Sequence, residues 1–413
     1  MPRIALPIFP GSNGEVDNMQ TLRRCGFDAF FFRWNEDISA LKDCDGYFFG
    51  AGFSYEDRGR SGMVAARDPF FDVLRKEAEA GKVLIGNCNG AQMLIESGLV
   101  PLGDGVRMAL AHNAINRGSG PEPTGFLNQW IWMTPLCKRD RCATSDWSGV
   151  MHVPIAHGEG RFITRDPELI QELQKNDQLA FGYCDERGVV SEDPTITPNG
   201  SLLGIAGICN REGNVVALMP HPERTPLGDA YFMSIHGWLR RKIRVSSARN
   251  SSLKHSEKRD VPWHTERGDE VFIETIITNN EERTVEQALS RVQPSVTLKQ
   301  YRYLSLPEGN SERALQTLSL FNPHKERAYL RREKKTYRWH GEKKSFIEMK
   351  EDLLKGVTYV RFDDVDFLQE SLGRESKAGV CYDCFHCSEE TSQQPAFLEV
   401  LSNPHSSTLV RLA

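Results

Sequence analysis

The apolar and polar positions of the first 80 residues predict strands and helices in alternation. Short apolar runs at 3–9, 29–32 and 47–49 are typical of buried strands in a parallel sheet, which have no polar face. Residues 16–25 and 68–80 instead show the spacing of helices with one apolar face. Such alternation is typical of a parallel sheet with helices on both faces. We therefore predict an α/β fold for this region.

The stretch that follows, 82–98, predicts a strand, a sharp turn and a helix. Its sequence is KVLIGNCNGAQMLIESG, in which the apolar run at 83–85 leads to Cys88. The apex residue of such a turn has strained backbone and needs small neighbours, which Gly86 and Gly90 provide. The apex side chain then stands at the carboxyl end of the sheet, where open α/β folds place their chemistry.

Cys88 is accordingly a candidate nucleophile. The dipole and free N–H groups of a helix N-terminus favour the thiolate, which is the reactive form of cysteine. The alternative is a structural cysteine, since a free cysteine is usually a small core residue. His221 and Glu223, in the downstream sequence MPHPER, favour catalysis. Covalent catalysis requires a nucleophile, a base and a group that orients the base.

Two histidines compete for the role of base. His157 lies in a turn beside two glycines, where a hydrogen-bonded structural role is the alternative. His221 precedes Pro222, which restrains it to extended backbone. In extended backbone, residues two apart project to the same side, so Glu223 could accept from one ring nitrogen of His221 while the other faces Cys88. We therefore assign the base to His221.

The motifs GNCNGAQ and MPHPER resemble those of class I glutamine amidotransferases. Four further segments narrow the likeness: PIFPGSN (7–13), GFSYEDRGRSG (52–62), PIAHGEGRF (154–162) and PNGSLLGIAGICN (198–210). Together they resemble the glutaminase subunit of phosphoribosylformylglycinamidine synthase, an enzyme of purine biosynthesis, over residues 1–240. Several motifs in consistent order are far more specific than one motif alone.

This resemblance implies a flavodoxin-like parallel sheet with a nucleophile elbow, and a triad of Cys88, His221 and Glu223. The thiolate would attack the side-chain amide of glutamine, and the histidine would protonate the departing ammonia and then activate water. Ammonia must avoid bulk water, so a channel to an ATP-dependent synthetase subunit is implied. We expect no cofactor in this chain, with ATP and Mg²⁺ on that partner. An independent cysteine hydrolase or glutaminase and a non-catalytic scaffold are the alternatives.

The resemblance also implies an oxyanion hole. Backbone N–H groups around Gly52 and Phe53, together with that of Asn89, would stabilise the tetrahedral oxyanion. Gly52 allows close approach of the backbone because it has no Cβ. Gln92, one turn after the cysteine, is expected to contact glutamine. The chain has Gly-Ala where the family has Pro-Gly before Gly52, so a simple surface turn is the alternative.

The composition changes after the first domain, for which we predict residues 1–244. A polar, Ser-rich linker is expected at 245–262 and a smaller α+β domain at 263–370. The predicted βαββαβ order of that domain is typical of a ferredoxin-like unit and is loosely similar to the small bridging subunit of the same synthases. An unrelated α+β appendage is the alternative. Residues 371–413 are expected to form a Cys-containing, disordered tail.

The tail contains CYDCFHC, with Cys381, Cys384, His386 and Cys387. Two overlapping C-x-x-C pairs suggest zinc, but the usual second pair is missing, so we expect free thiols and no metal. The run at 321–350 carries 10 Lys and Arg against 4 Asp and Glu. We interpret it as a solvated strand face or partner surface, with RNA binding as the alternative.

The composition indicates how many domains, which partners and which cellular location to expect. The 413 residues suffice for two or three domains of ~100–200 residues each. A net charge of −5 argues against nucleic acid as the main partner. No apolar run approaches the ~20 residues that span a bilayer, and the N-terminus meets Pro and Gly too early for a signal sequence. The ten cysteines lack a secreted-type framework, so we expect a cytoplasmic protein.

Overall fold

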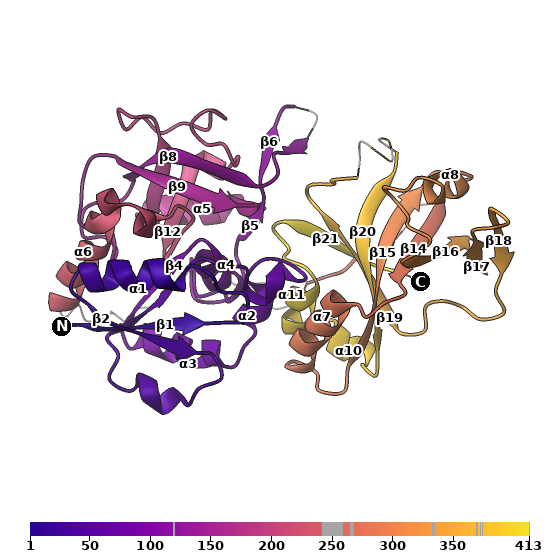
Figure 1. The fold of residues 1–413 in the computed structure, drawn as a ribbon, viewed down its shortest axis with the longest axis horizontal. Helices are drawn as coiled ribbons and strands as arrows, with labels where there is room; N and C mark the ends of the chain where they lie inside the picture. Colours follow the sequence, from indigo (N-terminus) through magenta and orange to yellow (C-terminus); the bar gives the residue numbers. More distant parts are fainter. Residues whose placement is uncertain are drawn as a thin grey trace. The chain divides into compact units, whose positions relative to one another are not determined.

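The computed structural model divides the chain into two compact units, Met1–His255 and Ser256–Ala413 (Figure 1). It describes residues 1–118, 120–241, 259–264, 268–332, 335–368, 371, 373 and 375–412. The predicted linker, 245–262, lies outside the described residues except for its last four. None of the described helices is both long and apolar enough to cross a membrane.

The first unit is built on a nine-stranded sheet with the order β2-β1-β3-β4-β13-β12-β11-β8-β9. The strands are β1 (Arg3–Ile8), β2 (Asp28–Arg33), β3 (Gly46–Phe49), β4 (Val83–Asn87), β8 (Leu127–Pro135), β9 (Met151–His157), β11 (Leu179–Cys184), β12 (Ile205–Cys209) and β13 (Val215–Leu218). From β2 to β13 all neighbouring pairs are parallel, which confirms the predicted α/β fold.

The other half of the same sheet is antiparallel. The sheet is therefore mixed rather than purely parallel. The antiparallel pairing of β12 and β13 follows from their short connection, because a few residues cannot hold the crossover helix that parallel strands need. Two small ribbons complete the unit: β5 (Ala109–His112) pairs with β10 (Glu159–Ile163), and β6 (Ala114–Asn116) pairs with β7 (Pro121–Pro123).

Helices cover both faces of the parallel strands (Figure 1). The α-helices of this unit are α1 (Glu15–Arg24), α2 (Met63–Ala66), α3 (Phe70–Glu79), α4 (Asn89–Glu96), α5 (Pro167–Lys175) and α6 (Asp229–Arg240). One apolar cluster joins the sheet to α3 and α4, for example through Leu74 and Leu94. A second cluster joins the sheet to α1 and α6 through Leu22 and Phe232. Both faces of the parallel strands are thus buried, as their apolar runs predict.

The second unit is an eight-stranded antiparallel sheet with helices, an α+β arrangement as predicted. Its strand order is β18-β17-β16-β14-β15-β20-β19-β21. The strands are β14 (Asp269–Thr275), β15 (Thr297–Leu306), β16 (Glu326–Arg332), β17 (Lys335–His340), β18 (Ser345–Glu348), β19 (Val357–Asp363), β20 (Lys377–Phe385) and β21 (Ser407–Arg411). Its helices include α7 (Asn280–Ser290), α8 (Ser311–Leu315), α10 (Glu389–Ser392) and α11 (Pro395–Leu401).

The ferredoxin-like prediction for this unit is wrong. Helix α7 joins β14 to β15, and these strands are direct antiparallel neighbours, with Phe272 opposite Tyr303. In a βαβ unit, by contrast, the strands joined by the helix run parallel. The predicted order βαββαβ is also incomplete, because α8 directly follows β15 and eight strands make up the sheet.

The prediction of a disordered tail is also wrong. Strand β20 lies inside the sheet between β15 and β19, and Cys381 and Cys384 on it are buried. Residues three apart on a strand project to opposite faces, so these two cysteines cannot share a metal ion. Among the residues that the structure describes, no group of three or more His, Cys, Asp or Glu side chains could hold a metal.

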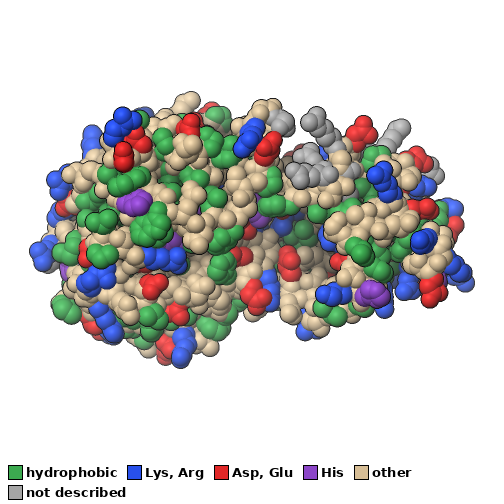
Figure 2. All heavy atoms as spheres, turned by 45° about the horizontal axis from the view of Figure 1, so that its top comes forward, with side chains coloured by type: hydrophobic (Ala, Val, Ile, Leu, Met, Phe, Trp, Pro, Cys, Tyr) green, Lys and Arg blue, Asp and Glu red, His purple; other side chains and the backbone are tan. Residues whose placement is uncertain are grey.

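The basic run at 321–350 forms β16, β17 and β18. Several of its cations pair with acids, for example Arg332 with Asp269 and Lys335 with Glu348. Figure 2 shows basic and acidic side chains interspersed over the face that it draws. This pairing agrees with the interpretation of the run as a solvated strand face.

Candidate active site

Cys88 lies at the junction of β4 and α4, with φ 52° and ψ −109°. Positive φ in a residue other than glycine costs on the order of 1–3 kcal/mol and persists only where the surroundings enforce it. Here the backbone N–H of Cys88 donates to the Leu218 carbonyl at 2.7 Å, and that of Gly90 donates to the Gly50 carbonyl at 3.1 Å. A Cβ on Gly90 would collide with the Phe49 carbonyl. The glycine pattern therefore predicted a strained apex that the structure contains.

His221 and Glu223 form a buried pair in which Nδ1 lies 2.6 Å from Oε1. The predicted extended backbone is wrong for this segment, because residues Pro222–Arg224 form a 3₁₀ turn. Proline favours the first position of a helical turn. The turn nevertheless brings the Glu223 carboxylate onto the imidazole. The backbone N–H of His221 donates to the Pro154 carbonyl at 2.9 Å, which ties the turn to β9.

The electrostatics of this pair favour the charged forms of both residues. Burial disfavours the imidazolium, yet the Glu223 carboxylate and the Cys88 thiolate raise the pKa of His221 to about 10. Burial also disfavours the carboxylate, but the charge of His221 and its hydrogen bond hold the pKa of Glu223 below its usual value. The pair therefore favours an imidazolium hydrogen-bonded to a carboxylate at neutral pH.

His157, the rival base, has a different environment. It is buried, and its Nδ1 lies 3.2 Å from Oδ1 of Asn113. The amide nitrogen of Asn113 donates to the carbonyls of His157 and Gly125, so its Oδ1 accepts. Burial and the charge of His221 lower the pKa of His157 to about 3. A neutral, hydrogen-bonded imidazole fits the structural alternative for His157 better than the role of base.

The three backbone N–H groups predicted to bind an oxyanion differ in their hydrogen bonding. In the described part of the chain, no hydrogen bond engages the backbone N–H of Gly52 or that of Asn89. The backbone N–H of Phe53 donates instead to the Gly11 carbonyl at 2.9 Å, so this N–H is not available to an oxyanion. A Cβ on Gly52 would lie 2.8 Å from the Cα of Ser12, so this position requires glycine.

Comparison with known proteins identifies the family of the first unit. Residues 1–236 match the family model described as a CobB/CobQ-like glutamine amidotransferase domain. The chain belongs to this family. The phosphoribosylformylglycinamidine synthase subunit PurQ of Methanothrix thermoacetophila is 43% identical over 225 residues, which are 54% of this chain and 86% of that protein. PurQ of Pyrococcus horikoshii is 33% identical over 249 residues, covering 58% and 100%. The structure of PurLQS from Thermotoga maritima aligns at 30% identity and TM-score 0.45, covering 58% and 99%.

The side chain of Gln92, expected to contact glutamine, makes hydrogen bonds within this glutamine amidotransferase domain. Its amide nitrogen donates to the Glu159 carbonyl at 2.5 Å, and its Oε1 accepts from the Asn89 side chain at 2.8 Å. Oδ1 of Asn89 in turn accepts from the backbone N–H of Ser54 at 3.0 Å. These two side chains therefore tie α4 to the neighbouring loop and to β10.

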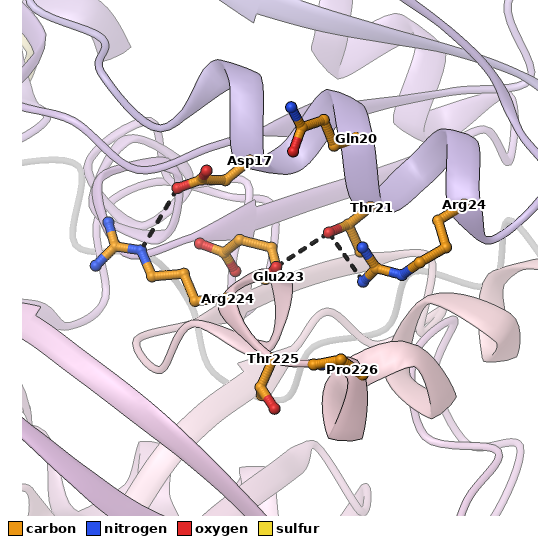
Figure 3. A pocket seen from close by; sticks show the side chains of 8 residues that line it. All are labelled: Asp17, Gln20, Thr21, Arg24, Glu223, Arg224, Thr225 and Pro226. Carbon is orange, nitrogen blue, oxygen red and sulfur yellow. Dashed lines mark hydrogen bonds and ion pairs between the residues drawn. The ribbon is translucent and has the colours of Figure 1, made fainter.

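The sequence did not reveal how the amidotransferase holds the turn at Pro222–Arg224. Thr21 on α1 donates to the Glu223 carbonyl at 3.0 Å, and Arg24 donates to the Thr21 hydroxyl at 3.2 Å (Figure 3). A pocket of about 250 Å³ opens beside this contact, between α1 and the turn. Its lining residues are Asp17, Gln20, Thr21, Arg24, Glu223, Arg224, Thr225 and Pro226. Thr21 lies 202 residues from Glu223, and no local pattern marks it.

Proposed function

We propose that this chain is the glutaminase component of a phosphoribosylformylglycinamidine synthase. Its similarity to PurQ proteins over most of their length supports the assignment. The observation that carries the chemistry is the buried His221–Glu223 pair, whose imidazolium faces the elbow cysteine Cys88. A buried ion pair of this kind at a strained turn is typical of an activated nucleophile.

In the proposed reaction, the Cys88 thiolate attacks the side-chain amide carbon of glutamine. The N–H groups of Gly52 and Asn89 receive the oxyanion. The His221 imidazolium gives its proton to the departing ammonia, which leaves a glutamyl thioester on the cysteine. Neutral His221 then takes a proton from water, the resulting hydroxide attacks the thioester, and glutamate is released. Glu223 remains ionised and stabilises the imidazolium in both steps.

Ammonia from this reaction would pass to a synthetase subunit, which we propose as the partner of this chain. ATP and Mg²⁺ would act on that subunit, and this chain would hold no cofactor. All ten cysteines are free, which fits a reducing, cytoplasmic setting. An independent glutaminase remains the second candidate, because the site described here lies wholly within residues 1–241.

The test is ammonia release from glutamine by wild type and Cys88→Ala. Each is assayed alone and with the synthetase subunit, ATP and formylglycinamide ribonucleotide. Turnover that requires Cys88 and rises on assembly is the expected result. Equal turnover without the partner would favour an independent glutaminase. Turnover that survives Cys88→Ala, or no turnover under any condition, would refute the catalytic assignment.

A further inference from the structure

Two buried polar side chains lie behind the catalytic carboxylate. Asn87 is the last residue of β4, directly before Cys88, and its Nδ2 donates to Oε2 of Glu223 at 3.2 Å. Tyr231 on α6 donates its hydroxyl hydrogen to Oδ1 of Asn87 at 3.0 Å. Both side chains are fully buried, with 0% of their surface exposed. A hydrogen-bonded chain therefore runs from Tyr231 through Asn87 and Glu223 to His221.

The direction of these bonds determines how the Asn87 amide is oriented. An asparagine amide has one acceptor and two donors, and either end could face the carboxylate. The Glu223 carboxylate can only accept, so the amide nitrogen is the end that faces it, and the amide oxygen accepts from the Tyr231 hydroxyl. The two oxygens of Glu223 then have separate partners, because Oε1 binds His221 and Oε2 binds Asn87. The carboxylate is held in one orientation, with both oxygens satisfied.

Core packing alone does not account for asparagine at this position. The preceding strand residues Val83, Leu84 and Ile85 are buried and apolar. A buried amide is costly unless its hydrogen bonds are made, and the side chain of Asn87 bonds to Glu223 and Tyr231. His221 and Arg224 are the other charged groups that face Glu223. Neither of them contacts Oε2 as the amide does.

We propose that Asn87 and Tyr231 are positioning residues for glutamine hydrolysis. Tyr231 orients the Asn87 amide, and the amide holds the Glu223 carboxylate so that it keeps the His221 ring directed at Cys88. This inference rests on the proposed function of the Cys88 site. It extends the catalytic apparatus to a strand residue next to the nucleophile and to a helix that carries no reacting group.

The test compares Tyr231→Phe and Asn87→Leu with a matched control, Tyr47→Phe. Tyr47 is also buried and also donates to a carboxylate, Glu77, but it lies outside this chain of contacts. Glutaminase kcat and KM are measured together with the rate of Cys88 alkylation by iodoacetamide as a function of pH. A hydrogen bond to a charged group corresponds to about a 10- to 100-fold effect. We expect kcat to fall by that factor in both test variants, KM to change less than about twofold, and the alkylation midpoint to move to higher pH.

A second variant keeps the test decisive if Asn87→Leu does not fold. Asn87→Asp has the same shape and keeps an acceptor for Tyr231, but places a carboxyl group against Glu223. Two such groups share one proton, and that proton restores the donor at low pH. The alkaline decline in the activity of Asn87→Asp should therefore begin at a lower pH than that of wild type. A purely structural role of Asn87 would not produce this shift.

A folded Tyr231→Phe variant that has the kcat and the alkylation profile of wild type would overturn the inference. An unchanged alkaline limb in Asn87→Asp would do the same. An inactive wild type would instead refute the proposed function, so the two failures are distinguishable. Tyr47→Phe should match wild type in every readout except thermal stability.

Discussion

Replacing Glu223 by glutamine tests the electrostatic role of the carboxylate. The pKa of His221 is raised to about 10, against an ordinary value of about 6.5 for histidine. Each pKa unit is worth ~1.4 kcal/mol, so the imidazolium gains ~5 kcal/mol in the folded protein. This is an upper limit for the substitution, because the Cys88 thiolate also contributes and a glutamine oxygen can still accept a hydrogen bond. We expect kcat to fall by ~10²- to 10³-fold with little change in KM.

The assay combines glutamine turnover with the pH dependence of Cys88 alkylation. In wild type the His221 imidazolium persists until the pH rises through about 10, so its positive charge is present at pH 7. In Glu223→Gln, burial leaves His221 neutral at pH 7, and alkylation there should be slow. The two proteins should converge as the pH approaches 10. Glu77→Gln, which removes a carboxylate bonded to Tyr47, is the control and should match wild type. Equal alkylation of Glu223→Gln and wild type at pH 7 would refute the reasoning.

Three further predictions concern the surrounding structure. Burial and the charge of Glu159 raise the pKa of Asp57 to about 7. Because ionisation is disfavoured in the folded state, stability is lost as pH rises from about 4 through 7. In calorimetry, Asp57→Asn should therefore raise the thermal midpoint at pH 8 but hardly at pH 4. Gly90→Ala should abolish turnover and slow alkylation, because the added Cβ meets the Phe49 carbonyl; wild-type activity would contradict the elbow geometry. Chelator treatment should leave the thermal midpoint unchanged, since Cys381 points away from Cys384; a drop would indicate a bound metal.

The local part of the fold could be predicted because local patterns determine it. The apolar runs gave the parallel strands, and the glycines around Cys88 gave the strained turn. The short spacing of His221 and Glu223 brought them together, although through a 3₁₀ turn rather than extended backbone. In each case the pattern that makes the prediction lies within a short stretch of the sequence.

Long-range pairing accounts for the failures. Asn87 and Tyr231 are 144 residues apart, and nothing in either neighbourhood indicates the other. The Phe53 N–H was assigned to the oxyanion, but it bonds to Gly11 in a loop far back in the chain. The predicted topology of the second unit was wrong for the same reason, because the order of strands in the sequence does not determine their order in a sheet. Strand β20 was not predicted, because its cysteine spacing suggested a metal site instead.

The most direct test of the central claim is to identify the covalent intermediate. Wild-type protein is acid-quenched during glutamine turnover, digested, and analysed by mass spectrometry. We expect a glutamyl thioester on the peptide that contains Cys88, and its absence in Cys88→Ala. A glutamyl adduct on another residue, or turnover by Cys88→Ala at the wild-type rate, would contradict it.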